Sequence, residues 1–95
     1  MNKLHDIESK LFRIFNSRFN IDFSQLEKDY YEYNLLGEFF RLDARDLLYI
    51  YFDVKNEFNI IIPEEDISNG KFSTFNGLLE IVKSQVMTDT VLANQ

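Results

Sequence analysis

The sequence predicts an all-α fold, a bundle of three main helices and one short helix with a long loop after the first helix. Apolar residues recur at the i, i+3, i+4, i+7 spacing in three segments, residues 3–19, 44–58 and about 73–86. This spacing places one apolar stripe along a helix. The β-branched run at residues 59–63 has no predicted partner strand, so we expect a buried linker there instead of a sheet. We expect one domain over residues 1–86 and a flexible tail over residues 87–95.

The composition excludes several classes of protein. Hydrophobic residues make up 45% of the 95 residues and aromatic residues 16%, which is too apolar for a disordered chain. The net charge of −6 disfavours binding to nucleic acid or to an anionic membrane surface. No cysteine is present, which excludes disulfides and thiolate chemistry. No apolar run reaches the ~20 residues that span a bilayer, and residues 1–20 lack a signal-peptide pattern, so we expect a cytoplasmic protein without membrane insertion.

The first predicted helix, residues 3–19, has one apolar face and one charged face. The residues expected to face the core are Leu4, Ile7, Leu11, Ile14, Phe15 and Phe19. The residues Asn20-Ile21-Asp22 break this pattern, so we expect the helix to end there.

The long connection, residues 21–43, is expected to contain a small element of its own, because connections of this length usually do. Ser24 and Glu27 have the spacing of a capping box and predict a short helical turn. Residues 29–34 are rich in aromatic and acidic side chains. Gly37 suits a turn that needs a positive φ. The residues expected to fasten this loop to the helices are Leu35, Leu36, Phe39 and Leu42.

The second predicted helix, residues 44–58, begins after an acidic cap. Asp43 can accept hydrogen bonds from the amides of the first turn, and Asp46 adds negative charge at the positive end of the helix. The residues expected to face the core are Leu47, Ile50, Tyr51, Val54 and Phe58. Pro63 then begins a short helix over residues 64–68.

The last predicted helix covers about residues 73–86, with Ser73 as its cap. The residues expected to face inward are Phe75, Leu78, Leu79, Val82 and Val86. Gly77 costs this helix up to ~1 kcal/mol relative to alanine, so we expect it to permit close packing.

The sequence offers little to support catalysis. It contains no GxSxG, HExxH or glycine-rich phosphate motif, and its one histidine, His5, cannot form a metal site alone. The acidic pairs at residues 64–66 and 43–46 are typical of helix N-termini. A further acidic set, Asp29, Glu32 and Glu38, lacks the spacing of an EF-hand. We therefore expect no catalytic residues and no metal, and a protein that is not an enzyme.

The second helix carries too many apolar residues for one buried face. Residues 47–52 are apolar without interruption, so some of Leu48, Tyr49 and Phe52 must lie outside the core. Either the long loop covers them, or they form a protein-binding patch flanked by Arg41 and Arg45.

The block Leu36–Leu47, together with the later run Glu57-Phe58-Asn59-Ile60-Ile61-Ile62-Pro63, resembles the acyl carrier proteins, and the spacing from the motif to the proline matches theirs without a gap. In that family a leucine-aspartate-serine-leucine motif opens the second helix, and a glutamate-phenylalanine-x-isoleucine-x-isoleucine-proline run ends it. The resemblance extends from about Leu35 to Val82 and includes the start of the last helix at residues 71–75. The motif serine of the family carries a phosphopantetheine arm. Its position here is Ala44, which has no oxygen to esterify, so the resemblance implies a degenerate attachment position and no cofactor unless residue 44 were serine.

The resemblance also bears on partners. Carrier proteins present acidic residues along the second helix to basic patches on enzymes. Here Asp46 keeps one acidic position, Tyr49, Lys55 and Asn56 occupy three others, and Arg45 replaces the leucine after the serine. This face is therefore expected to suit different partners. The candidate partner-binding residues are Arg41, Asp43, Arg45, Asp46, Leu48, Tyr49 and Phe52.

Two explanations of Ala44 remain. In the first, the chain is a natural protein without the arm and looks like the acyl carrier-related proteins of bacterial peptide maturation systems. It would then be a protein-interaction module, accessory to ribosomal peptide maturation, with a peptide-modifying or biosynthetic enzyme as partner. In the second, Ala44 is an engineered Ser-to-Ala change in a carrier for fatty acid, polyketide or peptide synthesis. Arg45 and the loss of the acidic face favour the first. Binding of a small molecule by the aromatic interior is a third possibility.

Overall fold

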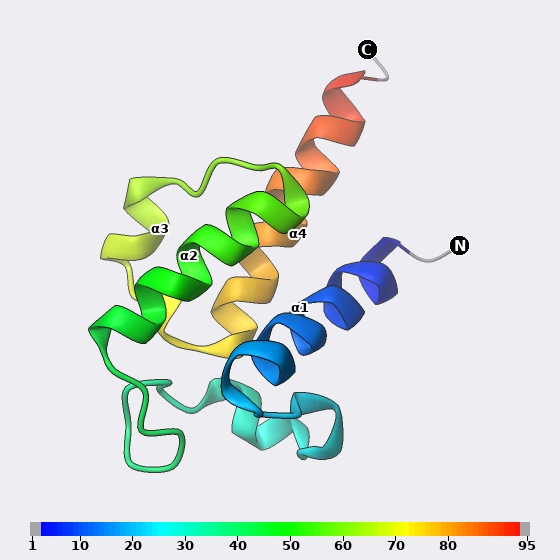
Figure 1. The fold of residues 1–95 in the computed structure, drawn as a ribbon. Coiled ribbons are helices and arrows are strands. Elements are labelled where there is room, and N and C mark those ends of the chain that lie inside the picture. The colour runs from blue at the N-terminus through cyan, green and yellow to red at the C-terminus, as the bar shows by residue number, and fades with distance from the viewer. Residues whose placement is uncertain (1–2, 94–95) are drawn as a thin grey trace.

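The protein is all-helical, as predicted. The computed structural model describes the backbone of residues 3–93 and the side chains of residues 5–86, and no strand occurs in this part of the chain. The α-helices are α1 (Lys3–Phe19), α2 (Ala44–Phe58), α3 (Glu64–Ser68) and α4 (Phe75–Ala93). The 3-10 helices are η1 (Phe23–Gln25), η2 (Lys28–Glu32) and η3 (Lys71–Ser73). Figure 1 shows the long helices α1, α2 and α4 arranged around the core, with the long loop below them.

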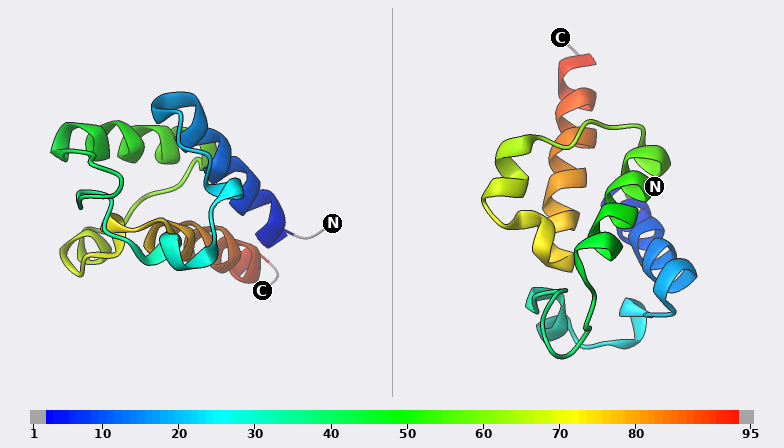
Figure 2. Two further views of the ribbon diagram at one scale, coloured as in Figure 1. Left: turned by 90° about the horizontal axis from the view of Figure 1, so that it is seen from below. Right: turned by 60° about the vertical axis from the view of Figure 1, so that its left-hand side comes forward.

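Aromatic side chains form the centre of the core. Phe23 lies between Phe15 of α1 and Phe75 of α4, with ring centroids 5.0 and 4.4 Å away. Phe23 and Leu35 are fully buried, and Tyr31 is 5% exposed. All three belong to the long loop. The loop is therefore one wall of the core, and Figure 2 shows it closing the end of the bundle.

Helix α1 has the predicted bounds and the predicted buried face. Ile7, Leu11 and Phe15 are buried, and Ile14 and Phe19 are partly buried against the core. The expected inward position of Leu4 lies outside the described side chains. The helix ends at Asn20, which adopts φ 60° and donates its N–H to the carbonyl of Asn16 at 3.0 Å. Asparagine tolerates this left-handed conformation and is a known helix terminator.

The beginning of the long loop differs from the prediction. Ser24 and Glu27 do not form a capping box. Instead, the Asp22 carboxylate accepts the N–H of Ser24 at 3.1 Å and caps η1. This arrangement turns Phe23 into the core, where the hydroxyl of Tyr31 donates to its carbonyl at 3.2 Å. Burial of Phe23 decides which polar residue serves as the cap.

The second half of the loop corrects two further predictions. Leu35 is buried and Leu42 is half-buried, but Leu36 and Phe39 are 45% and 52% exposed. Phe40 packs inward in place of Phe39, with its ring 5.0 Å from that of Phe23. Adjacent side chains in an irregular segment point in different directions, so only one of the two phenylalanines enters the core.

The turn at Gly37 needs no positive φ, contrary to expectation. Arg41 adopts φ 59° instead and donates its N–H to the carbonyl of Gly37 at 2.8 Å. Two backbone hydrogen bonds hold this part of the loop: from Leu42 to Leu35 at 3.0 Å, and from Leu35 to Ser73 at 2.7 Å. The segment that leads into α2 is therefore fastened to η3, directly before α4.

Helix α2 matches the prediction at both ends. Asp43 accepts the N–H of Asp46, and Asp46 accepts the N–H of Asp43, each at 3.0 Å. This reciprocal pair is a capping box. Ile50 and Val54 are buried, and the rest of the predicted stripe is partly buried. The helix ends at Asn59 with φ 54°.

The segment after α2 is a linker without a strand, as predicted, but only one face of it is buried. Ile60 and Ile62 are buried, whereas Ile61 between them is 76% exposed. This alternation is that of an extended chain with one face on the core. Pro63 then precedes α3, whose first turn contains three acidic residues.

Helix α4 begins at Phe75, two residues after the start of the predicted range, and has a different cap. Thr74, not Ser73, is the cap, and its hydroxyl oxygen accepts the N–H of Gly77 at 2.9 Å. Ser73 instead belongs to η3. The predicted inward residues lie on the core, and Ile81, which the prediction omitted, is buried with them.

The last helix also extends further than predicted. The backbone is helical to Ala93, seven residues beyond the expected end at residue 86. Residues 87–93 contain neither glycine nor proline, so the sequence holds no strong signal to stop the helix there. The remainder of the predicted flexible tail, residues 94–95, lies outside the described residues. None of the helices in the described part of the chain is both long and apolar enough to cross a membrane.

Candidate functional site

The predicted attachment position lies at an exposed helix start. Ala44 is the first residue of α2 and its side chain is exposed. The capping box formed by Asp43 and Asp46 on either side holds the backbone at this point. A side chain at position 44 therefore points away from the core, and alanine gives it no group that can be modified.

Three large apolar side chains lie exposed on the outer face of α2. Leu48, Tyr49 and Phe52 are 52%, 42% and 51% exposed. Phe52 follows Leu48 by four residues and Tyr49 by three, so its side chain neighbours both of them on the helix surface. The long loop does not cover them, so the first of the two alternatives raised for these residues is wrong. We call Arg45, Leu48, Tyr49 and Phe52 the α2 face.

The ring of Tyr49 is held in place from α1. The guanidinium carbon of Arg18 lies 4.8 Å from the centre of this ring. Arg18 also donates two hydrogen bonds to the carboxylate of Asp53, from Nε at 2.6 Å and from Nη2 at 2.9 Å. The hydrogen bond to Asp53 raises the pKa of Arg18, with desolvation acting in the opposite direction. A bidentate pair of this kind has a defined geometry, so it orients the guanidinium against Tyr49.

Arg18 and Asp53 are therefore members of the site that the sequence analysis missed. The 35 residues between them leave no local signal of their contact. Neither residue belongs to the predicted apolar stripe of its helix, which says nothing about its partner. Only the packing of α1 beside α2 brings them together.

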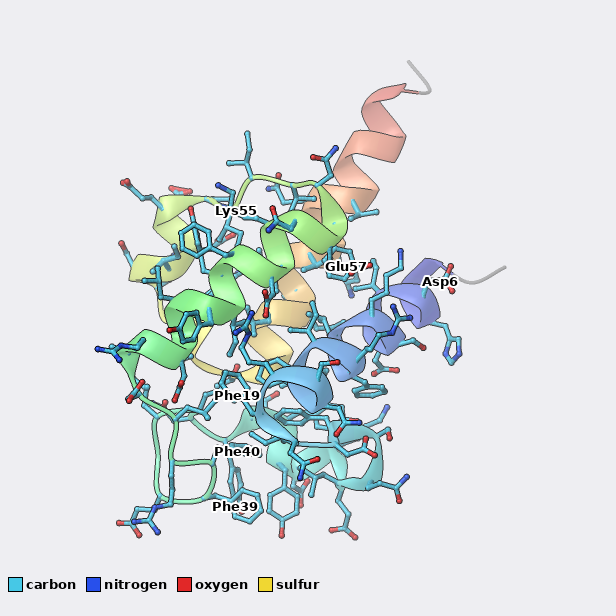
Figure 3. The ribbon with its side chains drawn as sticks, in the orientation of Figure 1. Asp6, Phe19, Phe39, Phe40, Lys55 and Glu57 are labelled. Atoms are coloured by element: carbon cyan, nitrogen blue, oxygen red, sulfur yellow. The ribbon has the colours of Figure 1, made fainter. Side chains whose placement is uncertain are left out.

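The charged candidates fall into two groups. Asp43 and Asp46 each accept a backbone N–H within the capping box, so both support the helix. Arg41 and Arg45 are exposed, and neither forms an ion pair among the described residues. The free cationic side chains at the start of α2 are therefore the arginines. Lys55, labelled in Figure 3, lies further along the helix, with Nζ 5.2 Å from the ring of Tyr51.

A second exposed apolar surface lies on the long loop. Tyr30 and Phe39 stack with ring centroids 4.7 Å apart, and Tyr33 packs against the edge of Phe39 at 5.7 Å. Leu36 is exposed beside them in sequence. We call Tyr30, Tyr33, Leu36 and Phe39 the loop surface; Figure 3 shows Phe39 at the lower end of the molecule. The aromatic and acidic composition of residues 29–34 was the one signal in the sequence that could have indicated it.

The molecule also has an open groove of about 610 Å³ between α1 and α2. Its walls carry both arginine and carboxylate side chains, and Arg18 and Asp53 neutralise one another across it. No group of three or more histidine, cysteine, aspartate or glutamate side chains placed to hold a metal ion occurs among the described residues.

Comparisons with known proteins give no match to a protein-family model, to a curated protein or to a solved structure. The resemblance to acyl carrier proteins therefore rests on the residues from Leu35 to Val82 and stays a prediction.

Proposed function

We propose that this chain is a carrier-like protein without the phosphopantetheine arm that acts by binding another protein and catalyses no reaction itself. The observation that carries the proposal is the α2 face. Its three large apolar side chains are exposed directly after Ala44, where the carrier family would hold its arm. Exposed apolar groups of this size that lie together usually mark a contact site.

The composition of the α2 face supports this use. Tyrosine and arginine are enriched among the residues that dominate binding energy in protein interfaces. Tyr49 is ordered by Arg18 before any partner arrives, with 4.8 Å between the guanidinium carbon and the ring centre. Binding would then cost less conformational entropy than it would for a free side chain.

The proposed partner is a peptide-modifying or biosynthetic enzyme in the cytoplasm, and the proposed role is accessory to the maturation of a ribosomal peptide. This part of the proposal rests on the resemblance to the carrier-related proteins. Arg41 and Arg45 favour a partner surface with carboxylates, unlike the basic patches that carrier proteins usually meet.

Site-specific crosslinking tests the interaction. A photoreactive amino acid replaces Tyr49 in one variant and Ser84, an exposed position on α4, in the control. Each variant is expressed in the source cells, irradiated, and its crosslinked proteins are identified by mass spectrometry. We expect one biosynthetic enzyme to crosslink through position 49 and not through position 84. Equal crosslinking at both positions, or none at position 49, would contradict the proposal.

The second candidate function is a working carrier in which residue 44 has been changed from serine to alanine. The exposed position of Ala44 at the start of α2 favours it, because a serine there would present its hydroxyl to solvent. The test is the intact mass of the chain and of Ala44→Ser after incubation with coenzyme A and a broad-specificity phosphopantetheinyl transferase. The unchanged chain should gain no mass. Modification of Ala44→Ser would favour the carrier, and a folded but unmodified variant would favour the protein without the arm.

A further inference from the structure

We infer that two copies of this chain bind each other, with the α2 face of each copy on the loop surface of the other. The charges and the exposed apolar residues of the two surfaces favour this pairing. It does not depend on the partner enzyme proposed above.

The two surfaces contain most of the exposed large apolar side chains. Eight such side chains occur among residues 5–86, and six of them belong to these surfaces. The α2 face contributes Leu48, Tyr49 and Phe52, and the loop surface contributes Tyr33, Leu36 and Phe39. Small monomeric proteins rarely leave apolar residues grouped in this way, so the grouping indicates a surface that becomes covered.

The charges beside the two surfaces have opposite signs. Exposed Arg45 belongs to the α2 face and exposed Arg41 precedes it in sequence, whereas exposed Asp29 and Glu38 are the sequence neighbours of Tyr30 and Phe39 in the loop surface. None of these four side chains takes part in an ion pair among the described residues. They are therefore available to pair with another molecule. Glu32, also beside the loop surface, accepts a hydrogen bond from the side-chain amide of Asn76.

The net charge of the chain argues for this particular pairing. At −6, two copies repel each other in most orientations. Placing the arginines of one copy against the carboxylates of the other replaces that repulsion with local attraction. Contact between two loop surfaces would instead bring Glu38 and its neighbouring carboxylates together.

The positions of the two surfaces permit a symmetric dimer. The loop leads directly into α2 through residues 41–43, so the two surfaces belong to consecutive segments of the chain (Figures 1 and 2). With a twofold axis at this junction, the α2 face of each copy contacts the loop surface of the other copy. Every contact is then made twice, as in most soluble homodimers.

Both surfaces are ordered before they meet. Phe39 stacks on Tyr30 at 4.7 Å, and Arg18 holds Tyr49 through the contact at 4.8 Å. A preformed surface loses less side-chain freedom on binding. Since the α2 face is also the proposed site for the partner enzyme, the dimer and that complex would exclude each other.

Charge reversal tests the inference without any unknown partner. Sedimentation equilibrium measures the dimerisation constant of the chain and of Arg45→Glu, Glu38→Arg and the variant with both changes. We expect a dimer for the unchanged chain, and a dissociation constant about tenfold or more higher for each single change. The double variant should regain affinity, because the reversed pair again has opposite charges. Arg45→Glu should keep its fold, since glutamate is favourable in the first turn of a helix.

Arg13→Glu is the matched control. Arg13 is exposed on α1 and belongs to neither surface, but its reversal changes the net charge by the same amount. It should weaken the dimer much less than Arg45→Glu does. A chain that stays monomeric at high concentration overturns the inference. A dimer that Arg13→Glu and Arg45→Glu weaken equally, or that the double variant fails to restore, overturns it as well. Because no enzyme partner is present, none of these results bears on the proposed function.

Discussion

Replacing Gly77 with alanine is expected to destabilise the protein, although alanine is the better helix former. Gly77 is buried in the first turn of α4. An added Cβ would lie 1.8 Å from the carbonyl oxygen of Lys71 and 2.6 Å from its carbonyl carbon. Both are backbone atoms, so no side-chain rotation can make room. Either η3 or α4 must move.

The size of the effect follows from two opposing contributions. Helix propensity favours alanine by about 1 kcal/mol. Overpacking at a rigid contact costs about 1–3 kcal/mol and occasionally more. The upper part of that range applies, because the segment that must move is also held to the long loop by the hydrogen bond from Leu35 to Ser73 at 2.7 Å. We therefore expect a net loss of roughly 2 kcal/mol, which lowers Tm by roughly 8–16 °C in a domain of this size.

Urea denaturation followed by circular dichroism measures this change. The midpoint should fall while the slope stays the same, because both variants expose the same surface on unfolding. Ser84→Ala, at an exposed position of the same helix, is the control and should leave stability unchanged or raise it slightly. If Gly77→Ala instead proves as stable as the unchanged chain, the close approach of η3 to α4 is wrong.

Two further predictions concern a helix cap and a buried tyrosine. Thr74→Ala should lower the free energy of unfolding by about 1 kcal/mol, because it removes the cap of α4, and Ser73→Ala should lower it much less. Equal losses for the two variants in urea denaturation would show that Thr74 is not the cap. Burial raises the pKa of the Tyr31 phenol above its ordinary value, and the charges of Glu8 and Asp22 raise it further. The folded state therefore resists ionisation of Tyr31, so this contribution to stability is full below pH ~10 and is lost as the pH rises through the folded pKa. The free energy of unfolding of Tyr31→Phe should therefore fall less above pH ~10 than that of the unchanged chain. An equal fall in both would rule out Tyr31 as its cause.

Local sequence signals predicted the helices well. Residues 3–19 and 44–58 were predicted with the bounds that the structure has, because each combines a long apolar stripe with a clear stop or cap. Asp43 was predicted as a cap, because the amides that an aspartate directly before a helix can bind lie in the first turn of that helix. Such contacts join residues near in sequence, so the sequence contains both partners in one window.

The loop was predicted poorly for the opposite reason. The sequence shows that residues 21–43 are rich in aromatic side chains, but it does not show which of them enter the core. Phe23 and Phe40 do so, and Phe39 does not. The choice depends on Phe75, which lies far along the chain and stacks on Phe23 at 4.4 Å.

The candidate site divides in the same way. The sequence alone shows that position 44 has no serine and that α2 has more apolar residues than one face can bury. It also predicts that some of these residues lie outside the core. Only the tertiary structure places Arg18 on Tyr49 and groups Tyr33 with Phe39 on the loop. Helix formation and capping depend on neighbours a few residues apart, and one stretch of sequence contains them. Exposure and contact between distant segments depend on how the whole chain packs, and that is decided only when the core is complete.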